Sequence, residues 1–134
     1  MRHIESAHQR AVIDWARRHP LARRIYAVPN GGKRSAFEAA RLKGEGVRAG
    51  VPDLCLNLPR GGAHGLFVEM KAPGGRESPE QKLVMEELVE EGYCVIVAHD
   101  ALLAIEAIRA YLDGQLPPGK HLRKPSAGAP RREA

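Results

Sequence analysis

Two carboxylates and one lysine lie at the ends of two segments that alternate apolar and polar side chains. Asp53 begins the first segment, and Glu69 and Lys71 close the second. Because neighbouring carboxylates repel each other, they favour a cation between them, and their oxygens suit Mg²⁺ or Mn²⁺. Such a metal polarises a phosphodiester for attack by water, and a lysine beside it orients the water or stabilises the developing charge. The residues indicate a metal site for phosphodiester hydrolysis; an ordinary ion pair at a strand end is the alternative.

This chemistry depends on how the two segments pair. Residues 53–58 and 66–71 flank a Gly- and Pro-rich connection, which predicts an antiparallel hairpin. We expect Leu54 opposite Met70, which buries one aliphatic face and puts the aspartate opposite the lysine, with the glutamate one step away on the same face. A slip of one residue would drive the charges into the aliphatic layer. A slip of two residues keeps the faces, so the pattern leaves it open.

Two further polar residues fall on helices beside this hairpin. Gln81 shares a helical face with Met85, so it points toward the sheet. Glu5 borders the packed face of the first helix near Val12, and its carboxylate can supply another metal ligand. Each has a plainer alternative. Gln81 closes a capping box with Ser78, and Glu5 is a solvated acid favoured by the helix dipole.

Hydrophobic periodicity predicts an α/β fold of four helices and four strands. The helices are expected over residues 4–18, 35–45, 79–91 and 101–112. The strands are expected over residues 25–28, 53–58, 66–71 and 94–98. The order α-β-α-β-β-α-β-α describes a mixed sheet flanked by helices.

Length and composition set the organisation of the chain. Its 134 residues suit one domain, which we place at residues 1–113. Residues 114–134 are rich in Gly, Pro, Lys and Arg and are expected to form a basic, disordered tail. The formal net charge of +5 weakly favours a polyanionic partner.

The remaining sequence features indicate where the protein works. Cys55 and Cys94 lie in apolar stretches without metal-ligand spacing, so we expect two buried free thiols in a reducing compartment. The N-terminus lacks the pattern of a signal peptide, and no apolar run approaches the ~20 residues that span a membrane. We expect a cytoplasmic protein.

Three basic residues follow paired glycines. Lys33 and Arg34 come after one Gly-Gly turn, and Arg76 comes after another, beside the predicted site. Such loops can bring backbone N–H groups and cations up to a phosphate, so these three residues are candidates for DNA binding. A solvated turn is the alternative.

The chain resembles the VRR-NUC domain family, a branch of the PD-(D/E)XK nuclease superfamily. The resemblance lies in Gly-Val-Pro-Asp-Leu at 50–54, Val-Glu-Met-Lys at 68–71 and Ser-Pro-Glu-Gln at 78–81. Segments 30–35 and 42–47 are similar to stand-alone phage and bacterial members. The likeness covers roughly residues 3–112.

The resemblance implies a restriction-endonuclease-like fold and cleavage of DNA with Mg²⁺ or Mn²⁺. It implies Asp53 and Glu69 as metal ligands and Lys71 as the catalytic lysine, and it matches Glu5 and Gln81 to the family's supporting acid and glutamine. Stand-alone members resemble Holliday-junction resolvases, whereas the version in the Fanconi-associated nuclease acts as a monomer on flaps. We therefore expect a homodimer that cuts branched DNA. The alternatives are a nucleic-acid-binding module with this fold but little cleavage, and a small-molecule phosphodiesterase.

Overall fold

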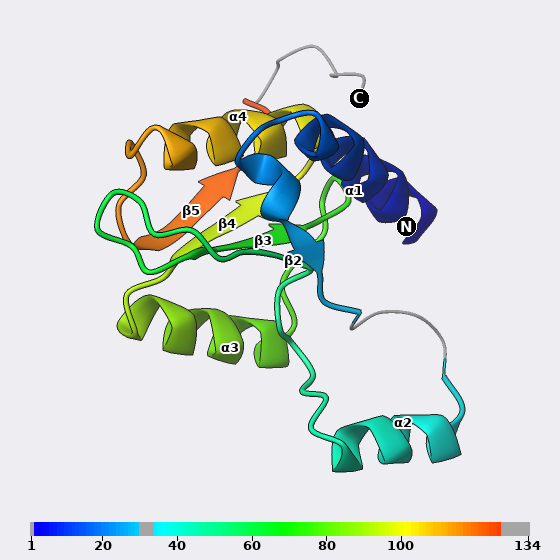
Figure 1. Ribbon diagram of the computed structural model, residues 1–134. Helices are drawn as coiled ribbons and strands as arrows, with labels where there is room; N and C mark the ends of the chain where they lie inside the picture. Colours follow the sequence, from blue (N-terminus) through cyan, green and yellow to red (C-terminus); the bar gives the residue numbers. More distant parts are fainter. Residues whose placement is uncertain (1, 30–33, 127–134) are drawn as a thin grey trace.

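A five-stranded mixed sheet forms the centre of the molecule (Figure 1). The structure is a computed structural model that describes residues 2–29 and 34–126. The strands lie side by side in chain order and are β1 (Tyr26–Ala27), β2 (Leu54–Leu56), β3 (Leu66–Met70), β4 (Cys94–Ala98) and β5 (Gly119–Arg123). The pairs β1–β2 and β2–β3 are antiparallel, whereas β3–β4 and β4–β5 are parallel.

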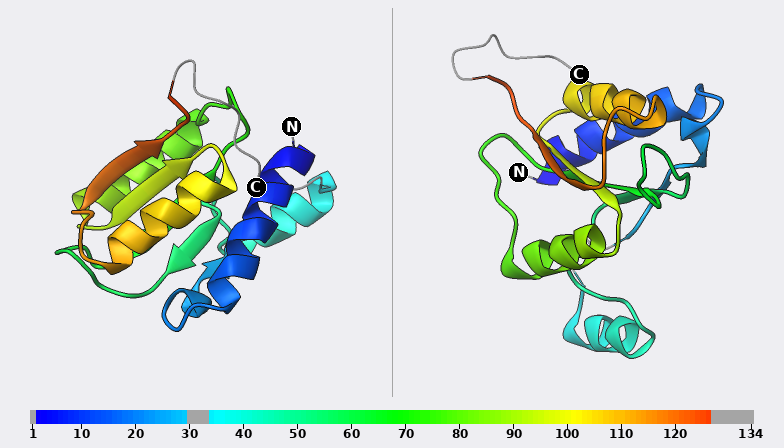
Figure 2. Two further views of the ribbon diagram at one scale, coloured as in Figure 1. Left: turned by 90° about the horizontal axis from the view of Figure 1, so that it is seen from above. Right: turned by 90° about the vertical axis from the view of Figure 1, so that its left-hand side faces the viewer.

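Helices cover both faces of the sheet (Figures 1 and 2). Helices α1 (Arg2–Arg17) and α4 (Ala101–Leu112) pack on one face, and α3 (Pro79–Glu90) packs on the other. A short 3₁₀ helix, η1 (Ala22–Arg24), lies between α1 and β1. The larger apolar cluster lies under α1 and α4, and a smaller one surrounds Met85 of α3. The expected α/β fold with a restriction-endonuclease-like sheet is confirmed, and so are all four helices.

Helix α2 (Ala36–Gly44) stands apart from the sheet, beyond α3 (Figures 1 and 2). Ser35 caps its first turn by accepting a hydrogen bond from the Glu38 N–H at 3.0 Å. None of its nine described residues is buried, and Phe37 is 81% exposed. The helix therefore has local capping but no core of its own.

The hairpin register differs by two residues from the expectation. Leu54 pairs with Val68 and not with Met70, and Leu56 pairs with Leu66. The cause is a sharp turn, because the Leu58 N–H bonds back to the Leu56 carbonyl at 3.0 Å and ends β2 early. The faces are preserved, so the aliphatic side chains stay buried. Continuing this register by one residue sets the aspartate before β2 opposite Glu69 instead of the lysine.

The expectation of a disordered tail was wrong for residues 119–123, which form β5. The strand pairs with β4 over its whole length, and the His99 N–H donates to the Arg123 carbonyl at 3.0 Å just beyond the last pair. Its side chains alternate between half-buried and exposed, so backbone pairing and not apolar burial holds it. Composition alone does not reveal such a strand. The last predicted tail residues, 127–134, lie outside the described residues.

Two other expectations can be compared with the structure. Cys55 and Cys94 are both buried free thiols, as expected. Over residues 2–29 and 34–126, no helix has the length and apolar character that crossing a membrane requires.

Candidate active site

The two acids and the lysine come together where β3 ends. Asp53 directly precedes β2, and its Oδ2 accepts a hydrogen bond of 2.8 Å from the Met70 N–H. The Lys71 ammonium lies 3.2 Å from Oε2 of Glu69. Both partners of this ion pair are almost fully covered, with residue exposures of 2% for Glu69 and 8% for Lys71. The structure thus confirms the convergence that the alternating pattern predicted, although the pairing partner of the aspartate has changed.

Gln81 connects the acid to the lysine. Its Oε1 accepts hydrogen bonds from the Lys71 Nζ at 2.7 Å and from the Ser78 N–H at 2.8 Å. Its Nε2 donates to Oε2 of Glu69 at 3.0 Å. The Ser78 Oγ completes the capping box by accepting from the Gln81 N–H at 3.2 Å, with Pro79 in the first turn. Both roles weighed for Gln81 hold at once: the helix cap fixes the amide that holds the ion pair.

Glu5 reaches the same place from the other side of the sheet. Its Oε1 accepts a hydrogen bond of 3.2 Å from the Ala72 N–H, directly after the lysine. Burial is the main cause of the raised pKa of Asp53, and the negative charge of Glu5 adds to it. Helix α1 therefore brings a third acid to the site, as its position on the helical face suggested.

The electrostatics of the site favour an added positive charge. Burial, followed by the charge of Asp53, raises the pKa of Glu69 to about 7, and the nearby Lys71 only partly opposes this shift. Burial also raises the pKa of Asp53, against the opposing hydrogen bond from the Met70 N–H. Acids that are costly to ionise together are stabilised by a cation.

One atom tests whether a divalent metal suits these residues. The Oε1 of Glu69 is buried and has no hydrogen-bond partner among the described residues. A buried polar atom without a partner calls for an explanation, and a metal ion supplies one. Across residues 2–29 and 34–126, no three His, Cys, Asp or Glu side chains form a ready-made metal cage. Mg²⁺ commonly binds through one or two carboxylates plus water and phosphate, so the donor set fits this ion.

Comparison with known proteins decides the family. The sequence matches the VRR-NUC domain over residues 2–101. The chain belongs to the VRR-NUC family. A solved structure described as a VRR_NUC domain protein is similar at 34% sequence identity and a TM-score of 0.72, covering 82% of this chain and 88% of that one. No match was found among curated protein sequences. A VRR-NUC domain is a nuclease domain of the PD-(D/E)XK class, and DNA is the substrate that such a domain implies.

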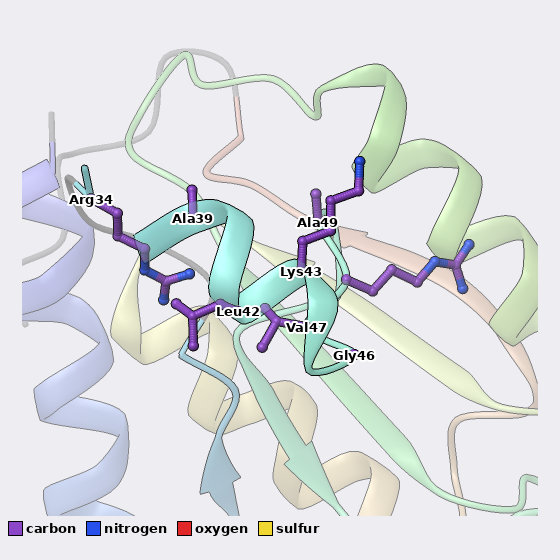
Figure 3. A pocket seen from close by; sticks show the side chains of 8 residues that line it. Arg34, Ala39, Leu42, Lys43, Gly46, Val47 and Ala49 are labelled. Carbon is purple, nitrogen blue, oxygen red and sulfur yellow. The ribbon is translucent and has the colours of Figure 1, made fainter. Parts of the chain in front are cut away.

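The candidate DNA-binding residues of this VRR-NUC chain lie in different places. Arg76 is exposed on the loop that follows Lys71. Arg34 lies beside α2, where its Nη2 donates to the Pro29 carbonyl at 2.7 Å. It helps to line a cavity of about 410 Å³ that includes Leu42 (Figure 3). Lys33 lies outside the described residues.

Sequence reasoning left out two residues near the VRR-NUC site. The His99 ring follows β4 and lies between two carbonyl oxygens, that of Gly75 at 3.3 Å from Nε2 and that of Arg123 at 3.4 Å from Nδ1. Lys120 of β5 forms an ion pair with Glu77 in the loop after β3. A signal for His99 was present, since it directly follows residues 94–98, which were expected to form a strand. No signal marked Lys120, because β5 was not expected.

Proposed function

We propose that this VRR-NUC protein is a divalent-metal-dependent, structure-specific DNA endonuclease. The observation that carries the proposal is the buried Oε1 of Glu69, which has no hydrogen-bond partner in the described part of the chain and lies beside a second acid and a lysine. Asp53 and Glu69 would hold Mg²⁺ or Mn²⁺, and Glu5 would complete the ligand set directly or through water. When bound, the ion polarises the scissile phosphodiester and stabilises negative charge on it.

The chain's own residues then have separable tasks. Lys71 presents a buried ammonium beside the acids, where it would orient the attacking water or stabilise charge on the phosphate. Gln81 keeps that ammonium in place through its Oε1 and keeps Glu69 in place through its Nε2. Because helix α3 is capped by Ser78, the amide is fixed before DNA arrives. Such preorganisation lowers the cost of reaching the transition state.

We further propose that the protein acts as a homodimer on branched DNA, like a Holliday-junction resolvase. A two-fold dimer presents two equivalent sites to two strands of opposite polarity. Helix α2 supports this assembly, because an isolated helix of nine residues is marginal in water unless it packs against something. Its Phe37 is 81% exposed within one chain, which suits a contact with a second copy.

The DNA backbone would be held by cations around this site. Arg76 is the best placed, because its loop starts at Lys71. Arg34 and Lys33 lie toward α2 in the sequence and would contact phosphates farther from the cut.

A nuclease assay on a panel of DNA structures tests the proposal. Linear, flapped and four-way DNA would be incubated with the full chain, with Mg²⁺ or with a chelator. We expect cutting of branched DNA that requires the metal. Binding without cutting on every substrate would favour a binding module, and cleavage only of small phosphodiesters would favour a different enzyme class.

A further inference from the structure

The loop of residues 72–78 joins the two halves of the candidate site. It leaves β3 directly after Lys71 and ends at Ser78, whose N–H donates to the amide oxygen of Gln81. Its first turn is closed by a hydrogen bond of 2.8 Å from the Gly75 N–H to the Ala72 carbonyl. The path of this loop therefore sets how the lysine and the glutamine meet.

Strand β5 contacts this loop directly through one ion pair, and the ring of His99 lies between the strand and the loop. Lys120, the second residue of β5, pairs with Glu77, whose side chain is 16% exposed. That hydrogen bond is the main reason why the pKa of Glu77 lies below its usual value. The His99 ring lies between the Gly75 carbonyl of the loop and the Arg123 carbonyl at the end of β5. The two loop residues in these contacts, Glu77 and Gly75, come shortly before Ser78 in the chain.

These contacts give β5 a role that the family match does not assign. The VRR-NUC match ends at residue 101, before β5 begins. We propose that Lys120 and Glu77, assisted by His99, are positioning residues that clamp loop 72–78 and so keep Gln81 engaged with the site. The inference rests on the proposed function, because it assigns these residues to the same active site.

The clamp differs from an ordinary surface ion pair in what it constrains. A single ion pair that keeps one partner 38% exposed adds little to stability, so losing the Lys120–Glu77 pair should leave the fold intact. Misplacement of a catalytic group by about 1 Å, in contrast, can slow a reaction strongly. The pair of Arg48 with Glu87 at 2.8 Å is a control, since it joins a different loop to α3 and does not touch loop 72–78. Its partners are 52% and 47% exposed.

The test is a double-mutant cycle on DNA cleavage. Glu77→Gln and Lys120→Gln should each lower kcat about tenfold, with KM and the melting temperature nearly unchanged. The double variant should be no slower than either single variant, because each breaks the same clamp. Lys120→Arg retains the pair and should restore kcat to within about threefold of the wild type, and Arg48→Gln should leave kcat unchanged.

The direction in which Glu77→Gln changes kcat distinguishes a positioning role from a general effect of charge. Glu77→Gln removes a negative charge near the proposed site of DNA cleavage, so charge alone would tighten DNA binding and not slow the reaction. An unchanged kcat in either single variant, additive losses in the double variant, or failure of Lys120→Arg to restore kcat would overturn the clamp.

A second readout does not need an active enzyme. Amide hydrogen exchange over residues 72–78 should speed up in Glu77→Gln and Lys120→Gln and stay at the wild-type rate in Arg48→Gln. If the wild-type chain cleaves no DNA, the proposed function fails and hydrogen exchange alone decides the clamp. Exchange at the wild-type rate in both clamp variants would refute it.

Discussion

Glu69 is buried, lies beside a second acid and has one carboxylate oxygen with no hydrogen-bond partner in residues 2–29 and 34–126. Its Oε2 is held by Lys71 and Gln81, while its Oε1 accepts no hydrogen bond among the described residues. Burial of the charged form of this acid lowers the stability of the fold, and a bound divalent cation would offset that loss. At the residue scale, the site therefore depends on the ligand it binds.

Removing one ligand charge should weaken metal binding. Asp53→Asn and Glu69→Gln each delete a negative oxygen donor, so we expect Mn²⁺ affinity to fall at least tenfold and cleavage to fall with it. Calorimetric titration of Mn²⁺ measures this directly, with the exposed Glu87→Gln as a control. Equal affinity in all four proteins would place the metal elsewhere.

The metal-free protein should lose stability as the pH rises. Because the pKa of Glu69 is raised from 4.5 to about 7 in the folded chain, the native state holds a proton there that the unfolded chain has released. The resulting stabilisation is full below about pH 4.5 and is lost as the pH passes through about 7. Thermal unfolding between pH 4 and pH 8 should show this loss, and Glu69→Gln should flatten it. A metal-free stability that rises with pH in the wild type and not in the variant would contradict the expectation.

At the scale of elements, α3 was the best predicted and β5 the worst. The Ser-Pro-Glu-Gln start of α3 fixed both its first residue and the direction of Gln81, because a capping box is a local interaction. The β2–β3 register was less certain. It depends on where the connecting loop turns, and the bend at Leu58 has no strong signal in the sequence. Strand β5 was missed because its sequence has no apolar pattern of its own. It is held by backbone pairing with β4, about 25 residues earlier in the chain.

The sequence predicted that the five candidate site residues converge, but it did not predict the contacts among them. Parity along the strands placed Asp53, Glu69 and Lys71 on one face whichever register was chosen. The bonds from Gln81 to two partners, and from Glu5 to the Ala72 backbone, depend on how α3 and α1 pack on the sheet. Such packing is a tertiary property that periodicity does not specify.

Truncation distinguishes β5 from the residues after it. Ending the chain at Asp113 removes β5 and bares the edge of β4, so we expect a loss of about 3 kcal/mol and a melting temperature lower by roughly 10 °C. Ending it after Ser126 keeps every described strand and should leave the melting temperature unchanged. Equal melting temperatures for the two truncations would show that β5 adds nothing to the fold.

At the scale of the whole molecule, α2 is a helix without a core within one chain. If it contacts a second copy through Phe37, then Phe37→Ser should weaken the dimer at least tenfold, as is typical of a buried aromatic anchor. The monomer should keep its melting temperature, because the ring is 81% exposed there. Sedimentation over a concentration series measures the dimer, with exposed Leu122→Ser on β5 as a control. A wild type that stays monomeric both free and on DNA would favour flap cleavage or nicking instead.

The central claim is that the acids and the lysine at the end of β3 cleave DNA. The most direct measurement compares wild type and Lys71→Ala on the same branched DNA with Mg²⁺, recording cleavage by gel and binding by fluorescence anisotropy. The lysine serves the transition state more than the bound ground state, so we predict cleavage reduced by about two to three orders of magnitude with binding nearly unchanged. Circular dichroism would confirm that the variant is folded. A folded Lys71→Ala protein that cuts at the wild-type rate would contradict the account.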